Sequence, residues 1–150
     1  IKQKILLVLV FLLFSNCGYE PLYVNLDNKL SFKEITTEGN KKINRRILSL
    51  AGLKINSQDS TGYNLNIGSK KNKEVISKDK QGNNSTYKLN ISVYIKLETT
   101  EKLFEEKQFN GSFVYSGTEN KLDLMQYEKE IEKNIIISIT DQINIFLRTL

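Results

Sequence analysis

Six apolar residues occupy every second position between residues 87 and 97, and no other feature of the sequence restricts the fold as strongly. The apolar positions are Tyr87, Leu89, Ile91, Val93, Ile95 and Leu97, and the positions between them are Lys88, Asn90, Ser92, Tyr94 and Lys96. Successive side chains of a β-strand point to opposite faces of its sheet. The pattern therefore predicts a strand with one buried face and one polar face, in a sheet that another layer covers on one side.

Two amphipathic helices are predicted to supply that cover. Residues 122–150 contain neither Gly nor Pro and repeat apolar residues at helical spacing: Leu124, Tyr127, Ile131, Ile135, Ile139, Ile143, Phe146 and Leu150. Ile137 and Ile145 fall outside this stripe, and their exposure would indicate a partner. A shorter helix over 41–51 begins after a capping Asn40, ends at Gly52 and buries Ile43, Ile47, Leu50 and Ala51.

Three further strands complete the expected fold. They are predicted at Leu30–Thr36, at 62–78 and around Phe109–Tyr115, with a turn at Gln81–Asn84 and a hairpin near Thr99–Lys102. The order is strand, helix, three strands, helix. We therefore expect an α+β two-layer sandwich in residues 30–150, with a roughly four-stranded mixed or antiparallel sheet and both helices on one face.

Composition argues against most kinds of enzyme. The chain of 150 residues has no His and one Cys, so it lacks the usual general base and any multi-cysteine zinc site. The adjacent pair Glu105-Glu106 would point to opposite faces of a strand. We predict no catalytic residue, no metal site and no cofactor, and the net charge of +5 is too small to indicate nucleic-acid binding.

The first 17 residues indicate export and lipid attachment. Lys2 and Lys4 precede the apolar run Ile5–Phe14, which is the layout of a secretory signal peptide. The run ends shortly before Cys17, and this resembles a bacterial lipoprotein signal, in which residues 1–16 are removed and the cysteine is acylated. The alternative is a free buried thiol in the mature protein. Residues 17–29 are then a tether that spans at most ~40 Å, and Gly18 after the cysteine points to the outer membrane by resemblance to enterobacterial sorting.

The stretch "CGYEPLY" at 17–23 resembles the start of mature LptE-family proteins, the outer-membrane lipoproteins of lipopolysaccharide (LPS) assembly, especially their alphaproteobacterial branch. The matching residues are Cys17, Gly18, Tyr19, Pro21, Leu22 and Tyr23. The resemblance implies a periplasm-facing, lipid-anchored protein that plugs an LptD-like β-barrel, helps it assemble and contacts LPS. The alternative is an accessory lipoprotein of another envelope complex, similar to a pilotin.

Two basic clusters are candidates for contact with anionic LPS. The first contains Lys70, Lys71, Lys73, Lys78 and Lys80, and the second contains Lys41, Lys42, Arg45 and Arg46. The alternative for both is an ordinary solvated surface. Of the polar strand face, Tyr94 is the unusual member, because it is an aromatic residue at a position expected to meet water or a partner.

Overall fold

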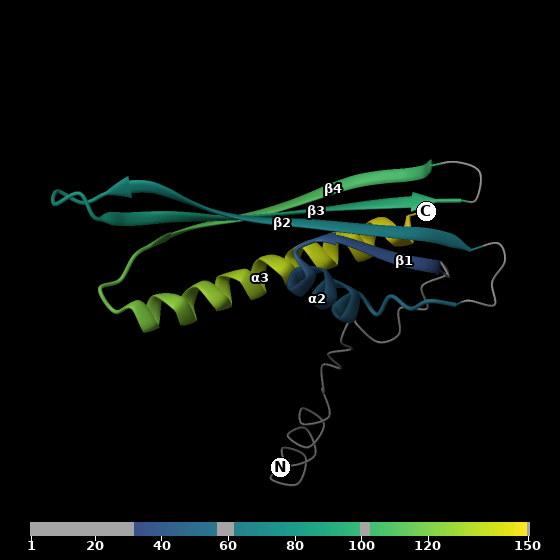
Figure 1. The fold of residues 1–150 in the computed structure, drawn as a ribbon, viewed down its shortest axis with the longest axis horizontal. Helices are drawn as coiled ribbons and strands as arrows, with labels where there is room; N and C mark the ends of the chain where they lie inside the picture. The colour runs from purple at the N-terminus through teal and green to yellow at the C-terminus, as the bar shows by residue number, and fades with distance from the viewer. Residues whose placement is uncertain (1–31, 57–61, 100–102, 150) are drawn as a thin grey trace, which may run out of the picture.

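The computed structural model describes residues 32–56, 62–99 and 103–149, and these form one sheet with both helices on one of its faces (Figure 1). The elements in chain order are β1 (Phe32–Gly39), α2 (Lys41–Ala51), β2 (Tyr63–Lys78), β3 (Asn84–Glu98), β4 (Leu103–Ser116) and α3 (Lys121–Arg148). Strand β1 is parallel to β2, whereas β2–β3 and β3–β4 are antiparallel. The predicted α+β sandwich, with its mixed sheet and element order, is confirmed.

The ends of α2 form as its sequence predicts. The Asn40 side-chain oxygen accepts hydrogen bonds from the backbone N–H groups of Lys42 and Ile43, both at 3.2 Å. Gly52 ends the helix with a φ of +65°, a conformation that is strained for residues with a Cβ. The side chain of Asn120 caps α3 in the same way, by accepting from the N–H of Leu122 at 2.9 Å.

The core lies between the helices and one face of the sheet. The alternating apolar residues of β3 are buried there, except for Tyr87, which is partly buried, and the isoleucines of α3 pack against them. Gly111 on β4 permits close approach of α3, since a Cβ at this position would lie 2.6 Å from Cγ2 of Ile135. Among the described residues the core extends from Phe32 to Leu147, and a chain that begins at Gly18 contains every one of these residues.

Two details of β1 and α2 differ from the sequence predictions. Strand β1 runs from Phe32 to Gly39 and so extends past Thr36; Leu30 and Leu150 lie outside the described residues. Leu50 is 47% exposed, because the buried face of α2 is turned toward Asn44 instead. Asn44 donates to the backbone oxygen of Glu38 at 2.6 Å and accepts from the Ser69 hydroxyl at 2.5 Å.

The buried apolar stripe on α3 also begins later along the helix than predicted. Tyr127 is 46% exposed and touches Tyr115 only edge-on, with 6.0 Å between ring centroids. From Ile131 onward the predicted positions are buried, and Ile136 and Leu147 join them. Ile137 and Ile145 are exposed, as their place outside the stripe indicated.

Candidate functional site: the open sheet face and the lysines of β2

The face of the sheet opposite the helices is open and polar. The side chains of Lys88, Asn90, Ser92, Tyr94 and Lys96 lie on it, as predicted, because the apolar residues between them are buried under the helices. Part of this face is a shallow polar cleft of about 490 Å³. Its lining includes Lys88, Asn90 and Ser92 of β3, Lys70 and Asn72 of β2, and Asn110 and Ser112 of β4. Charged and amide groups in such a cleft suit a phosphorylated or hydroxyl-rich ligand.

Glu74 organises the centre of this cleft. Its carboxylate accepts hydrogen bonds from the Asn72 amide at 2.8 Å and from the Asn90 amide at 3.2 Å. Within the part of the chain that the structure describes, the ammonium groups of Lys70 and Lys88 form no ion pair or side-chain hydrogen bond. The cleft therefore holds two cations with free donors, together with one carboxylate and the two amides that bond to it.

Tyr94 has an intramolecular role on this face. A Cβ on Gly68 would lie within 2.2 Å of the tyrosine ring, so the ring lies over the glycine on the neighbouring strand. The Tyr94 hydroxyl donates to the Glu38 carboxylate on β1. This hydrogen bond and a second one from the Asn66 amide lower the pKa of Glu38. The bond to Glu38 also raises the pKa of Tyr94. Tyr94 thus connects three strands, and its aromatic character is explained without a partner.

The first basic cluster does not form one surface. Its members Lys70, Lys71 and Lys73 lie on β2, and because side chains alternate along a strand, Lys71 and Lys73 face α3 while Lys70 faces the open side. Lys78 is the last residue of β2, and Lys80 lies in the turn to β3. The structure therefore separates the five lysines into a helix-facing pair, one lysine in the polar cleft, and two at the hairpin end.

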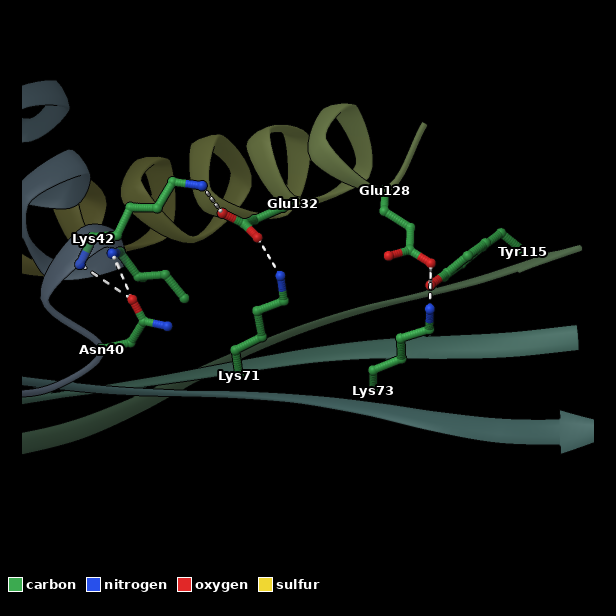
Figure 2. A network of polar contacts seen from close by, with 8 residues as sticks. Asn40, Lys42, Lys71, Lys73, Tyr115, Glu128 and Glu132 are labelled. Carbon is green, nitrogen blue, oxygen red and sulfur yellow. Dashed lines mark hydrogen bonds and ion pairs between the residues drawn. The ribbon is translucent and has the colours of Figure 1, made fainter. Parts of the chain in front are cut away.

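Lys71 and Lys73 form ion pairs with α3, which Figure 2 shows from the side. One carboxylate oxygen of Glu132 pairs with the ammonium group of Lys71. The other pairs with the ammonium group of Lys42 on α2, at 3.1 Å. Glu128 receives Lys73 and also accepts a hydrogen bond from the Tyr115 hydroxyl at 2.8 Å. These six residues join the sheet, α2 and α3, and we call them the interlayer clamp: Lys42, Lys71, Lys73, Tyr115, Glu128 and Glu132.

The clamp changes the proton affinity of its members. Burial alone would raise the pKa of Glu132, but the bonds from Lys71 and Lys42 outweigh it, so the pKa lies below its ordinary value of 4.5. The same balance, with Lys73 and Tyr115 as donors, lowers the pKa of Glu128. Burial and the bond to Glu128 raise the pKa of Tyr115. Both carboxylates are therefore ionised at neutral pH and hold their lysines in place.

The second basic cluster lies on α2. Lys41 and Arg45 are exposed and Arg46 is half-buried, whereas Lys42 is the member that reaches Glu132. Sequence reasoning did not identify Glu128 or Glu132. The available signal was weak, namely two acids four residues apart beside the apolar stripe of α3. Cys17 and the rest of residues 1–29 lie outside the described residues.

Among the described helices, none combines the length and the apolar character that a membrane-spanning helix requires. No protein-family model and no curated protein matches the sequence. Solved structures do match. The crystal structure of rare lipoprotein B from Shewanella oneidensis superposes with a TM-score of 0.61 at 16% identity, over 77% of this chain and 94% of that one.

The chain shares the fold of this lipoprotein. Two further structures agree with that assignment. A minor lipoprotein from Acinetobacter baumannii matches with a TM-score of 0.55 at 15% identity, over 77% of this chain and 90% of that one. Lipoprotein B from Nitrosomonas europaea matches with a TM-score of 0.50 at 14% identity, over 77% of this chain and 81% of that one.

Proposed function

We propose that the protein is an outer-membrane lipoprotein, acylated at Cys17, that plugs an LptD-like β-barrel from the periplasmic side and assists LPS insertion at the cell surface. The proposal is supported by two independent features that agree with each other. The heptapeptide at 17–23 resembles the start of mature LptE-family proteins, and the domain that follows has the fold of rare lipoprotein B.

The shape of the domain is compatible with this role. It is a thin sandwich of one sheet and one layer of helices, elongated along α3 and the long strands (Figure 1). No described helix or strand covers the open face, which carries polar side chains, as a surface that meets the wet interior of a barrel or LPS would require. The proposed role is non-catalytic, with the acyl groups on Cys17 as the expected covalent modification and no other cofactor.

Recovery of the barrel tests the plug role. We expect a C-terminally tagged full-length chain, extracted from outer membranes in mild detergent, to co-purify with one large LptD-like β-barrel in a 1:1 ratio by native mass spectrometry. The control is the same extraction from cells that express an unrelated tagged lipoprotein. Recovery of secretion or pilus components instead of the barrel would support the pilotin-like alternative and contradict the proposal.

Lys70 and Lys88 are the best-placed lysines for contact with LPS phosphates, because both line the polar cleft and neither is paired within the described chain. At a partly solvated surface each such contact contributes on the order of 1 kcal/mol. Lys70→Glu combined with Lys88→Glu should therefore weaken LPS binding to the chain from Gly18 onward by about 2 kcal/mol, roughly 30-fold, and flatten its salt dependence.

The matched control is Lys41→Glu combined with Arg45→Glu on α2, which makes the same change in net charge on exposed residues of the second cluster. Affinity is read by titration with fluorescently labelled LPS at low and physiological salt, with thermal melting as a check on folding. Equal losses in both double variants would mean that net charge, and not the cleft, determines binding.

A further inference from the structure

Strand β4 is an edge strand with a neighbour on one side within the described sheet. Its first half carries Glu105, Glu106 and Lys107, which is how proteins commonly prevent edge-to-edge pairing. Its second half, residues 108–116, contains no charged residue, and Phe113 and Val114 are 46% and 53% exposed. An uncharged edge with exposed apolar side chains on both faces is a site where another strand can add.

The hydrogen-bonding direction of this edge follows from one contact. The N–H of Gly117 donates to the oxygen of Ser85 at 2.8 Å, and the β3–β4 register continues without a shift from Thr86–Ser116 to Leu97–Glu105. Residues of an antiparallel strand alternate between bonding to one neighbour and to the other. Odd-numbered residues of β4 therefore bond to β3, and Asn110, Ser112 and Val114 turn their backbone groups outward.

A cleft of about 390 Å³ opens beside this edge, between β4 and α3. Its lining includes Gly111, Phe113, Tyr127, Ile131 and Ile135, so it is mainly apolar and aromatic. Gly111 has no side chain, and the side chains of Ile135 and Ile139 lie directly below it. The cleft thus lies next to Gly111, and the exposed Phe113 lies two residues further along the same strand.

We propose that β4 pairs antiparallel with β4 of a second copy of this chain, about a two-fold axis at Ser112. In this register Ser112 faces Ser112, Asn110 faces Val114, and the outward backbone groups of both strands meet. Gly111 faces Phe113 of the other copy, so each Phe113 enters the cleft beside the other chain's glycine. The arrangement is isologous, as expected of a symmetric dimer.

The position of the charged residues and the length of the paired segment favour this register over the neighbouring registers. With the axis at Ser112, residues 108–116 of the two copies pair throughout, and Glu105, Glu106 and Lys107 lie beyond the end of the opposing strand. An axis at Gly111 would place Lys107 opposite Tyr115 and Glu106 opposite Ser116, and an axis at Asn110 would bring these charges still further into the pairing. An axis at Phe113 would leave only residues 110–116 paired. The interface is small compared with the ~800 Å² per partner of a standard complex, so we expect a dimer that dissociates on dilution.

Sedimentation velocity on the chain from Gly18 onward tests the pairing. We expect the mass to rise from monomer to dimer over a roughly hundredfold range of concentration. Ser112→Lys and Ser112→Glu should each remain monomeric, because like charges then face each other across the axis. An equimolar mixture of the two should dimerise again, because opposite charges then face each other. Phe113→Ser should weaken the wild-type dimer.

Thr36→Lys is the matched control, since it adds the same charge to β1, the strand at the other edge of the described sheet, and it should dimerise like the wild type. Circular dichroism melting of each variant separates loss of pairing from loss of folding. A wild-type chain that stays monomeric throughout the range, or a Ser112→Lys variant that dimerises normally, would overturn the proposal. So would a mixture of the two Ser112 variants that stays monomeric.

Discussion

Replacing Cys17 by alanine is expected to abolish lipid attachment. If Cys17 is the acylation site, the wild-type protein extracted from membranes begins at residue 17 and carries the mass of its acyl chains. Each buried CH2 of such a chain contributes ~0.8 kcal/mol to membrane binding, so several chains hold a protein almost irreversibly. Cys17→Ala should carry no lipid mass and keep residues 1–16, since lipoprotein signals are cleaved only at the modified cysteine. Intact-mass spectrometry reads both changes.

A second variant separates the lipid from the signal peptide. When residues 1–16 are replaced by an ordinary cleavable signal in the Cys17→Ala chain, nearly all of the protein should move from the membrane to the soluble fraction. Ser15→Ala, which changes a neighbouring small residue and keeps the thiol, should be processed and acylated like the wild type. Wild-type protein without added lipid, or lipid mass on the alanine variant, would show that Cys17 is not the acylation site.

The elements that the sequence predicted best are those that depend on a local period. The alternation from Tyr87 to Leu97 gave β3 and its buried face, and the helical spacing from Ile131 onward gave the covering face of α3. Asn40 and Gly52 marked the ends of α2, because capping depends on residues within a single turn. Such signals can be read without knowing where other elements lie.

What the sequence could not give depends on placement in three dimensions. The alternation of side chains along β2 was enough to place Lys70 on one face of the sheet and Lys71 and Lys73 on the other. The partner of Lys71 could not be found in this way, because Glu132 is 61 residues away along the chain. Their pairing depends on where α3 crosses the sheet. The contact of Tyr94 with Gly68 likewise depends on the register between β2 and β3. Leu50 was misassigned because the buried hydrogen bonds of Asn44 turn α2.

Among single substitutions in β2, we expect Lys71→Glu to lower the free energy of unfolding the most. Lys71→Glu removes one partner of Glu132, which is 8% exposed, and brings a second carboxylate toward it. Loss of one partner from a fully buried ion pair costs ~3–5 kcal/mol. Glu132 keeps Lys42, and the Lys71 side chain is 35% exposed, so we expect a smaller loss, about 1–3 kcal/mol in the free energy of unfolding at neutral pH.

Lys70→Glu provides a matched control at the adjacent residue. It makes the same chemical change, but its side chain lies on the open face and pairs with no described residue, so we expect a change within about 0.5 kcal/mol. Urea unfolding of the two variants measures the difference. If both lose the same free energy, the Lys71–Glu132 ion pair contributes nothing beyond an ordinary surface charge.

The pH dependence gives an independent check on the same pair. The pKa of Glu132 is lower in the folded protein than its ordinary value of 4.5, so the unfolded chain takes up the proton first as the pH falls. The stabilisation by Lys71 is therefore complete above that value and is lost as the pH falls through the lower, folded pKa. Protonation also removes the repulsion between Glu132 and the added carboxylate of Lys71→Glu. The difference in stability between wild type and Lys71→Glu should accordingly be largest near pH 7 and shrink in acid, whereas a difference that persists unchanged at low pH would point to packing of the lysine side chain in place of its charge.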